Sequence, residues 1–215
     1  MTQIIKNILC FGDSNTWGLN AKTGKRFESH NRWPAQLGIK LGSRFNIIEA
    51  GEPNRTLVNI PPFDGQLTGV RYLKPYLNND LAIIIIALGT NDLKKRFDLS
   101  AKHIAQGLNQ LITQIKQYYV LKKYAMLPDI LVINPPQVQL IGPYSHIYDG
   151  AIEKLLPLKH EFKMVAEQNE SYFFDLNNII DVLGCDGIHF EASHHAIISD
   201  AIHKKIQKIL NAKMT

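Results

Sequence analysis

The sequence lacks the features that define small disulfide-rich proteins and nucleotide-binding proteins. Its 215 residues include only two cysteines, Cys10 and Cys185, with no CxxC pair and no Cys/His ligand spacing. A disulfide scaffold needs more cysteines, so this count favours a reducing compartment. No GxGxxG or Walker pattern follows an apolar segment, which argues against nucleotide binding.

Long apolar runs are also missing. The longest, residues 81–88, is far too short to cross a membrane. The early run at residues 8–11 is broken by Gly12 and shows no typical signal-peptide cleavage site. We therefore expect a cytoplasmic protein with no membrane partner.

Positive charge is only slightly in excess, with 24 Lys and Arg against 19 Asp and Glu. The basic residues form small clusters at 94–96, 122–123 and 204–205, which we interpret as solvated surface rather than a nucleic-acid interface. Apolar residues make up 45% of the chain, enough for a continuous core. With no repeat and no linker, residues 1–215 are expected to form a single domain.

Apolar runs alternate with amphipathic stretches along the chain. Asn31 and Ser100 are the expected N-caps of the helices at residues 33–41 and 104–119. The alternation predicts right-handed βαβ units and a parallel sheet covered on both faces. Strands are expected at residues 4–11, 45–49, 81–88, 130–133 and 172–176, and helices at 33–41, 67–77, 104–119, 152–168 and 193–210.

Polar residues follow several of the expected strands. Because ligands gather at the carboxyl ends of the strands in an open α/β sheet, these residues are candidates for one site. They supply a hydroxyl, a glycine amide, a carboxamide, a carboxylate and an imidazole, which are the parts of an acyl-transfer site. The segments are Gly12-Asp13-Ser14, Gly51, Gly89-Thr90-Asn91-Asp92 and Asp186-Gly187-Ile188-His189.

A serine hydroxyl is a weak nucleophile that needs a base and donors for the developing oxyanion. His189 is the candidate base for Ser14, and Asp186 is close enough to fix its tautomer. The N–H groups of Ser14 and Gly51 and the side chain of Asn91 are the candidate oxyanion donors. Each segment alone is a common turn or surface pair, so the prediction rests on their combination.

The four segments resemble the conserved blocks of the SGNH hydrolases, also called the GDSL esterase/lipase family. Residues 11–18 resemble the nucleophile block, and the other blocks match Ala50-Gly51, residues 89–92 and residues 186–189. The resemblance implies a three-layer α/β/α, flavodoxin-like fold with a five-stranded parallel sheet. It also implies the roles given above, with no cofactor and no metal.

Further residues resemble the bacterial arylesterase and acyltransferase branch, in the stretches 16–18, 55–56 and 91–94. The resemblance implies that Trp17 and Ile188 line the acyl or alcohol pocket and that Lys94 lies at its mouth. Simple core packing is the alternative for Trp17. The chain departs from the family at Asn15, where leucine is usual, and the segment that follows Gly51 is also unusual.

Other conspicuous residues have plainer interpretations. We expect Cys10 and Cys185 to be buried thiols, although a redox switch beside the site is conceivable. His194 and His195 have no carboxylate at a ligand interval, so no metal is expected there. Residues 137–150, with three aromatic rings, form a long loop that suits a lid or an oligomer contact.

The leading hypothesis is hydrolysis of a small carboxylic ester, short-acyl or aryl, through an acyl-enzyme intermediate, with acyl transfer to other alcohols as an added activity. The expected partner is a small-molecule ester, and a homo-oligomer is left open. A carbohydrate O-deacetylase and a lysophospholipase or thioesterase would use the same residues. A flavodoxin-like binding module without catalysis is the non-enzyme alternative.

Overall fold

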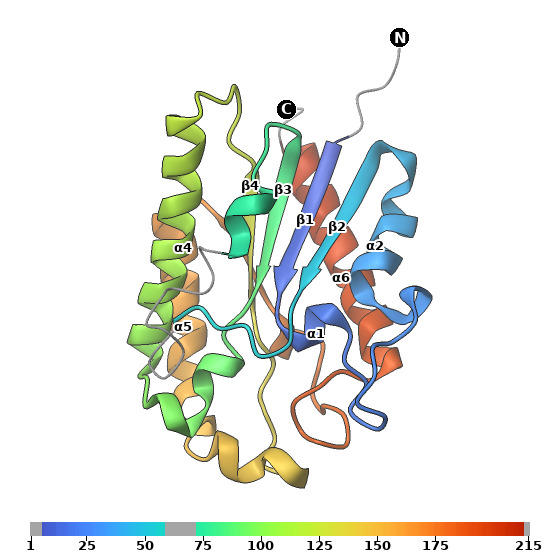
Figure 1. Cartoon of the computed structure of the whole chain (residues 1–215), viewed down its shortest axis with the longest axis vertical. Coiled ribbons are helices and arrows are strands. Elements are labelled where there is room, and N and C mark those ends of the chain that lie inside the picture. Colours follow the sequence, from blue (N-terminus) through green and yellow to red (C-terminus); the bar gives the residue numbers. More distant parts are fainter. Residues whose placement is uncertain (1–5, 59–71, 213–215) are drawn as a thin grey trace.

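The computed structural model describes residues 6–58 and 72–212, which contain a five-stranded parallel sheet (Figure 1). The strand order is β2-β1-β3-β4-β5, and every neighbouring pair runs parallel. This doubly wound order is that of flavodoxin-like folds, so the predicted fold class is confirmed. The strands are β1 (Lys6–Gly12), β2 (Phe45–Gly51), β3 (Leu81–Ala87), β4 (Asp129–Asn134) and β5 (Tyr172–Asp175).

Helices on both sides complete the three layers. The α-helices of the described residues are α1 (Ser14–Trp17), α2 (Trp33–Leu41), α4 (Ala101–Leu121), α5 (Ile152–Gln168) and α6 (Ala192–Asn211). Short 3-10 helices occur at Ser29–Asn31, Gly42–Arg44, Lys74–Tyr76, Asn91–Leu93, Lys95–Phe97, Gly142–Tyr148 and Leu176–Asn178.

The sheet separates two hydrophobic cores. α4 and α5 pack together on one face, and α2 and α6 on the other (Figure 1). Along β1, Leu9 and Phe11 belong to the core beside α4 and α5, whereas Ile8 and Cys10 belong to the core beside α2 and α6. Because both faces are covered, the unbroken apolar run of β3 is the expected pattern for a central parallel strand.

Most predicted elements occur close to their expected bounds. α2 and α5 match them, and Ser100 caps α4 by accepting a hydrogen bond from the His103 N–H at 3.2 Å. The predicted Asn31 cap is wrong, because Asn31 ends a 3-10 helix and Arg32 precedes α2 without a side-chain cap. Pro34 lies in the first turn, where its missing N–H removes one donor that a cap would have to satisfy.

Two predicted segments differ from expectation or lie outside the described part of the chain. Residues 67–71 of the helix expected at 67–77 lie outside the described residues, and its described part contains the 3-10 helix Lys74–Tyr76. The long loop at residues 137–150 contains the 3-10 helix Gly142–Tyr148. No helix within 6–58 and 72–212 is long and apolar enough to span a membrane.

The carboxyl ends of β1, β2 and β3 lie at one edge, and α1 packs against those of β1 and β2. Gly12 is in register with Gly51 on one side and with Ala87 on the other. A Cβ on Gly51 would lie 2.1 Å from the Trp17 nitrogen, and one on Gly12 would lie 2.0 Å from the Thr16 Oγ1. Glycine at both positions therefore lets α1 lie directly on the strand ends.

Phe162 is fully buried on α5 and packs closely against the loop that follows β3. A Cβ on Gly89, which lies in that loop, would be 3.1 Å from the Phe162 ring. We expect Phe162→Ala to lower the free energy of unfolding by about 3–5 kcal/mol, since it leaves a cavity. Leu156→Ala, at a side chain 77% exposed on the same helix, should change it by less than about 0.5 kcal/mol. Urea denaturation measures both, and equal losses in the two variants would contradict this packing.

Candidate active site

Ser14 is the first residue of α1 and is held there by its neighbours. β1 ends at Gly12, and the Asp13 side chain caps α1 by accepting a hydrogen bond from the Asn15 N–H at 2.9 Å. Gly18 ends the helix in the left-handed conformation, with φ 89°. The Ser14 side chain is thereby fixed at the edge of the sheet, with its hydroxyl directed at His189.

The imidazole of His189 links Ser14 to Asp186. His189 Nε2 lies 2.9 Å from Ser14 Oγ, and His189 Nδ1 lies 2.6 Å from Asp186 Oδ2. The other carboxylate oxygen of Asp186 accepts the N–H groups of Ile188 at 3.0 Å and His189 at 2.9 Å. The short turn thus orients the carboxylate and the imidazole together. Gly187, at φ 74°, provides the turn.

The electrostatics of this turn favour an ionised Asp186. Burial opposes ionisation, but hydrogen bonds from the His189 ring, the His189 N–H and the Ile188 N–H outweigh it and lower the pKa of Asp186 to about 2. The carboxylate is therefore negative at neutral pH. It can hold a proton on Nδ1 and leave Nε2 as an acceptor for the Ser14 hydroxyl.

Asn15, where the chain departs from the family, ties α1 to the turn that contains His189. Its Nδ2 donates to the Ile188 carbonyl at 3.1 Å, and its Oδ1 accepts the Phe190 N–H at 3.0 Å. The two bonds reach the residues that precede and follow His189 in the sequence. The side chain does not line the cavity beside Ser14, and it acts on the backbone that positions the imidazole.

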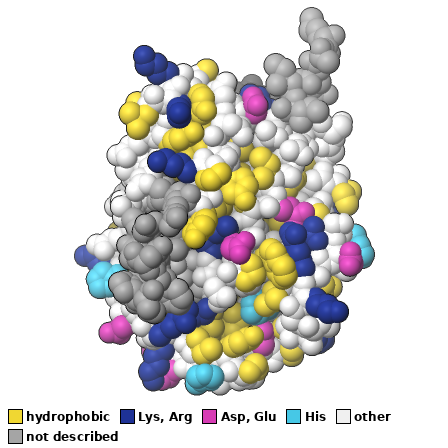
Figure 2. Space-filling model, viewed as in Figure 1, with side chains coloured by type: hydrophobic (Ala, Val, Ile, Leu, Met, Phe, Trp, Pro, Cys, Tyr) yellow, Lys and Arg dark blue, Asp and Glu magenta, His cyan; other side chains and the backbone are white. Residues whose placement is uncertain are grey.

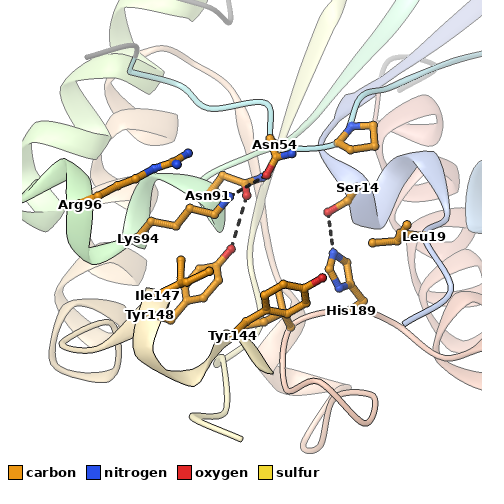
Figure 3. Close-up of a pocket in the computed structure, with 12 residues that line it drawn as sticks. Ser14, Leu19, Asn54, Asn91, Lys94, Arg96, Tyr144, Ile147, Tyr148 and His189 are labelled. Carbon is orange, nitrogen blue, oxygen red and sulfur yellow. Dashed lines mark hydrogen bonds between the residues drawn. The ribbon is translucent and has the colours of Figure 1, made fainter. Parts of the chain in front are cut away.

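A cavity of about 410 Å³ opens beside Ser14 and His189 (Figure 3). Three of the residues predicted for substrate or oxyanion contact, Asn91, Lys94 and Ile188, lie in its wall. Trp17 and Gly51 are not among the described residues that line it, so their predicted roles stay predictions. The wall consists of Ser14, Leu19, Pro53, Asn54, Asn91, Lys94, Arg96, Tyr144, Ile147, Tyr148, Ile188 and His189.

Trp17 and Gly51 have other contacts in the structure. The Trp17 ring lies 5.4 Å from the guanidinium of Arg26. Gly51 allows the close approach of α1 to β2. Asn54, which no sequence motif indicated, lines the cavity and has a φ of 65°. An asparagine directly after a proline was the available signal, because asparagine tolerates the left-handed conformation in turns.

The side chain of Asn91 is oriented by two hydrogen bonds. Its Nδ2 donates to the Arg55 carbonyl at 3.1 Å, and its Oδ1 accepts from the Tyr148 hydroxyl at 3.4 Å. One Nδ2 hydrogen remains for a ligand, since a carboxamide nitrogen has two. The Arg55 guanidinium, buried 4.2 Å from the Phe11 ring, donates to the Gly12 carbonyl and fixes this loop to β1.

Comparisons with known proteins show the family of this chain. The model of the GDSL-like lipase/acylhydrolase family matches residues 10–197. The chain belongs to this family. The predicted SGNH resemblance is thereby confirmed, and the protein is a carboxylic ester hydrolase. A search of curated proteins gives no match.

Solved structures of esterases resemble the fold over most of the chain. Est24, a carbohydrate acetylesterase from Sinorhizobium meliloti, has a TM-score of 0.87 at 30% identity, over 95% of this chain and 99% of that one. The M. smegmatis aryl esterase has a TM-score of 0.86 at 33% identity, over 94% and 99%. A carbohydrate acetylesterase family member from S. meliloti has a TM-score of 0.87 at 25% identity, over 96% and 100%.

Behind the cavity of this GDSL-family protein, a buried carboxylate organises the loop after β2. Asp92 accepts the N–H groups of Leu57 at 3.0 Å and Val58 at 2.8 Å. Burial raises the pKa of Asp92 to about 7 against the effect of these bonds. Burial likewise raises the pKa of Asp13, although the Asn15 N–H opposes it. Both carboxylates thus bind backbone amides of the site.

The remaining conspicuous residues are accounted for without a metal. His194 Nδ1 accepts the Glu191 N–H at 3.1 Å, and His195 Nδ1 accepts the Trp33 N–H at 3.3 Å. Within 6–58 and 72–212, no group of three or more His, Cys, Asp or Glu is arranged to bind a metal ion. Cys10 is buried as expected, whereas Cys185 is exposed because its turn lies at the surface, which corrects the prediction of two buried thiols.

Asn15→Leu, which introduces the usual family residue, should impair this site. It leaves the Ile188 carbonyl and the Phe190 N–H without their partner, at about 1–3 kcal/mol for each buried group. We expect kcat for 4-nitrophenyl acetate to fall by about tenfold or more, with a smaller change in KM. Asn211→Leu, the same substitution at an exposed residue of α6, is the matched control and should retain kcat. An unchanged kcat in Asn15→Leu would contradict the positioning of His189 by Asn15.

Proposed function

We propose that the protein hydrolyses small carboxylic esters, short-acyl or aryl, through an acyl-enzyme intermediate on Ser14. The observation that carries the proposal is the hydrogen-bonded series Ser14–His189–Asp186, with distances of 2.9 and 2.6 Å, whose first two members line a cavity of about 410 Å³. A nucleophile, a base and an orienting carboxylate in this order are the requirements for acyl transfer.

In the proposed first step, Ser14 Oγ attacks the ester carbonyl carbon while His189 Nε2 takes the hydroxyl proton. Asp186 stabilises the resulting imidazolium. The tetrahedral intermediate collapses when the bond to the alcohol oxygen breaks and His189 returns the proton to that oxygen. In the second step, water is deprotonated by His189 and attacks the acyl carbon, and Ser14 leaves with the proton.

Two of the three predicted oxyanion donors, Ser14 and Asn91, are supported by their positions. The N–H of Ser14 lies in the first turn of α1, and the Asn91 amide faces the cavity. For the third donor, the cavity favours the N–H of Asn54 over that of Gly51, because Asn54 lies in the wall between Ser14 and Asn91 (Figure 3). Three fixed donors can stabilise the developing negative charge.

The substrate proposal draws on the relatives. The M. smegmatis neighbour is an aryl esterase, which supports aryl esters as substrates. Est24 is a carbohydrate acetylesterase, which makes removal of acetyl groups from carbohydrates the second candidate. Acyl transfer would require only that an alcohol replace water in the second step. A lysophospholipase or thioesterase activity has no specific observation in its favour.

Ser14→Ala should reduce kcat/KM for 4-nitrophenyl acetate by a factor on the order of 10⁴ or more, because no nucleophile remains. A fluorophosphonate probe should label the wild type on the peptide that contains Ser14 and should not label the variant. Ser29→Ala, at an exposed serine, is the control and should retain both properties. Labelling at another serine, or full activity in Ser14→Ala, would refute the assignment.

The two candidate substrate classes can be separated directly. We expect kcat/KM for phenyl acetate to exceed that for a peracetylated monosaccharide by at least about tenfold, because tyrosine and aliphatic side chains line much of the cavity. Acetate release from both esters is the measurement. A preference for the sugar ester would support the carbohydrate acetylesterase alternative instead.

A further inference from the structure

The wall of the active-site cavity contains two cationic side chains. Lys94 and Arg96 lie across the cavity from Ser14 and His189 (Figure 3). Of the described residues that line the cavity, none is Asp or Glu. On the face seen in Figure 2, Lys and Arg side chains lie beside hydrophobic ones at the end of the molecule that contains the carboxyl ends of the strands. The cavity is therefore positive on the side away from His189.

Lys94 is the buried member of this pair. Its residue is 7% exposed, and its Nζ donates to the neutral Oδ1 of Asn54 at 2.8 Å. The ammonium also lies 6.0 Å from the centre of the Tyr148 ring. Within the described chain, no carboxylate forms an ion pair with Lys94. Since an ammonium has three N–H donors and the described residues show one hydrogen bond, two donors remain for a ligand in the cavity that Lys94 lines.

The charged groups around Lys94 do not balance its positive charge. Burial, followed by repulsion from Arg96, lowers its pKa to about 8. The nearby carboxylates that oppose this effect are Asp13 and Asp92, and both are buried and accept backbone N–H groups. An isolated buried ammonium is costly unless it is paired. A ligand with a negative charge would supply the missing partner.

We propose that Lys94 binds a carboxylate on the ester substrate, so that the enzyme prefers esters with a negative charge to neutral esters of the same size. Arg96, exposed at the rim, would add long-range attraction. This inference rests on the proposed function of Ser14. The carboxylate can belong to the acyl part or to the alcohol part, since both extend from the same carbonyl carbon.

Two matched pairs of esters test the proposal. For the acyl part, mono-4-nitrophenyl glutarate is compared with its methyl ester. For the alcohol part, 4-acetoxybenzoate is compared with its methyl ester. We expect the ratio of kcat/KM, charged over neutral, to fall at least tenfold in Lys94→Gln in one of the pairs. Comparing wild type and variant on the same ester removes differences in intrinsic reactivity.

The control variants separate charge recognition from other roles of Lys94. Lys94→Arg should keep the wild-type ratio within about threefold, because the positive charge remains. Lys95→Gln removes an exposed lysine that pairs with Asp149 at 2.6 Å, and it should leave the ratio unchanged. Equal losses for charged and neutral esters in Lys94→Gln would mean that Lys94 only supports Asn54, and would overturn the proposal.

A measurement on the wild type alone covers the case in which Lys94→Gln fails to fold. Glutarate or 4-hydroxybenzoate should inhibit competitively, and this inhibition should weaken as the pH rises through about 8, where Lys94 loses its proton. Inhibition that does not change with pH would overturn the proposal. If the wild type turns over neutral esters without any charge preference, only this inference fails. If Ser14 is neither labelled nor required, the proposed function fails as well.

Discussion

The active site depends on backbone packing that tolerates no side chain. α1 lies on the ends of β1 and β2 because Gly12 and Gly51 have no Cβ, and an added one would lie within 2.1 Å of atoms of α1. This contact fixes the start of α1, and with it Ser14, relative to the sheet. Asn15 then fixes the turn of His189 relative to α1 through two hydrogen bonds. Each part of the site is positioned by the part before it, starting from the strand ends.

The sequence was sufficient to predict the fold and the residues that meet at the edge of the sheet, because apolar periodicity and strand ends follow local rules. It did not predict the contacts that depend on backbone conformation. Asn54 enters the cavity through a left-handed φ of 65°, and Asn15 turns toward the backbone of Ile188 and Phe190. Both depend on tertiary contacts, which no periodicity in the sequence predicts. Gly51 lies against α1 in the structure, and its role as an oxyanion donor stays a prediction.

Charges are separated across the site in a way that suits acyl transfer. Asp13 and Asp92 lie behind the cavity and bind backbone N–H groups, and Asp186 lies behind the imidazole. The polar groups that line the cavity are hydroxyls, amides, an imidazole and two cations. A negative charge that develops on the carbonyl oxygen would therefore meet donors and positive charge. Because the carboxylates are already hydrogen-bonded, the site can hold them without placing negative charge beside the reacting carbonyl.

The contact between Lys94 and Asn54 connects charge recognition to the proposed oxyanion donors. A carboxylate would share the ammonium with the Asn54 side chain, since one N–H already serves Asn54 and two remain. The Asn54 loop would then keep the same conformation with charged and neutral esters. Differences between the two classes should consequently arise in binding and appear in KM, whereas kcat should remain similar because the donors to the oxyanion are unchanged. Replacing Asn54 itself would disturb both properties together, because its backbone and its side chain contribute to different parts of the same wall.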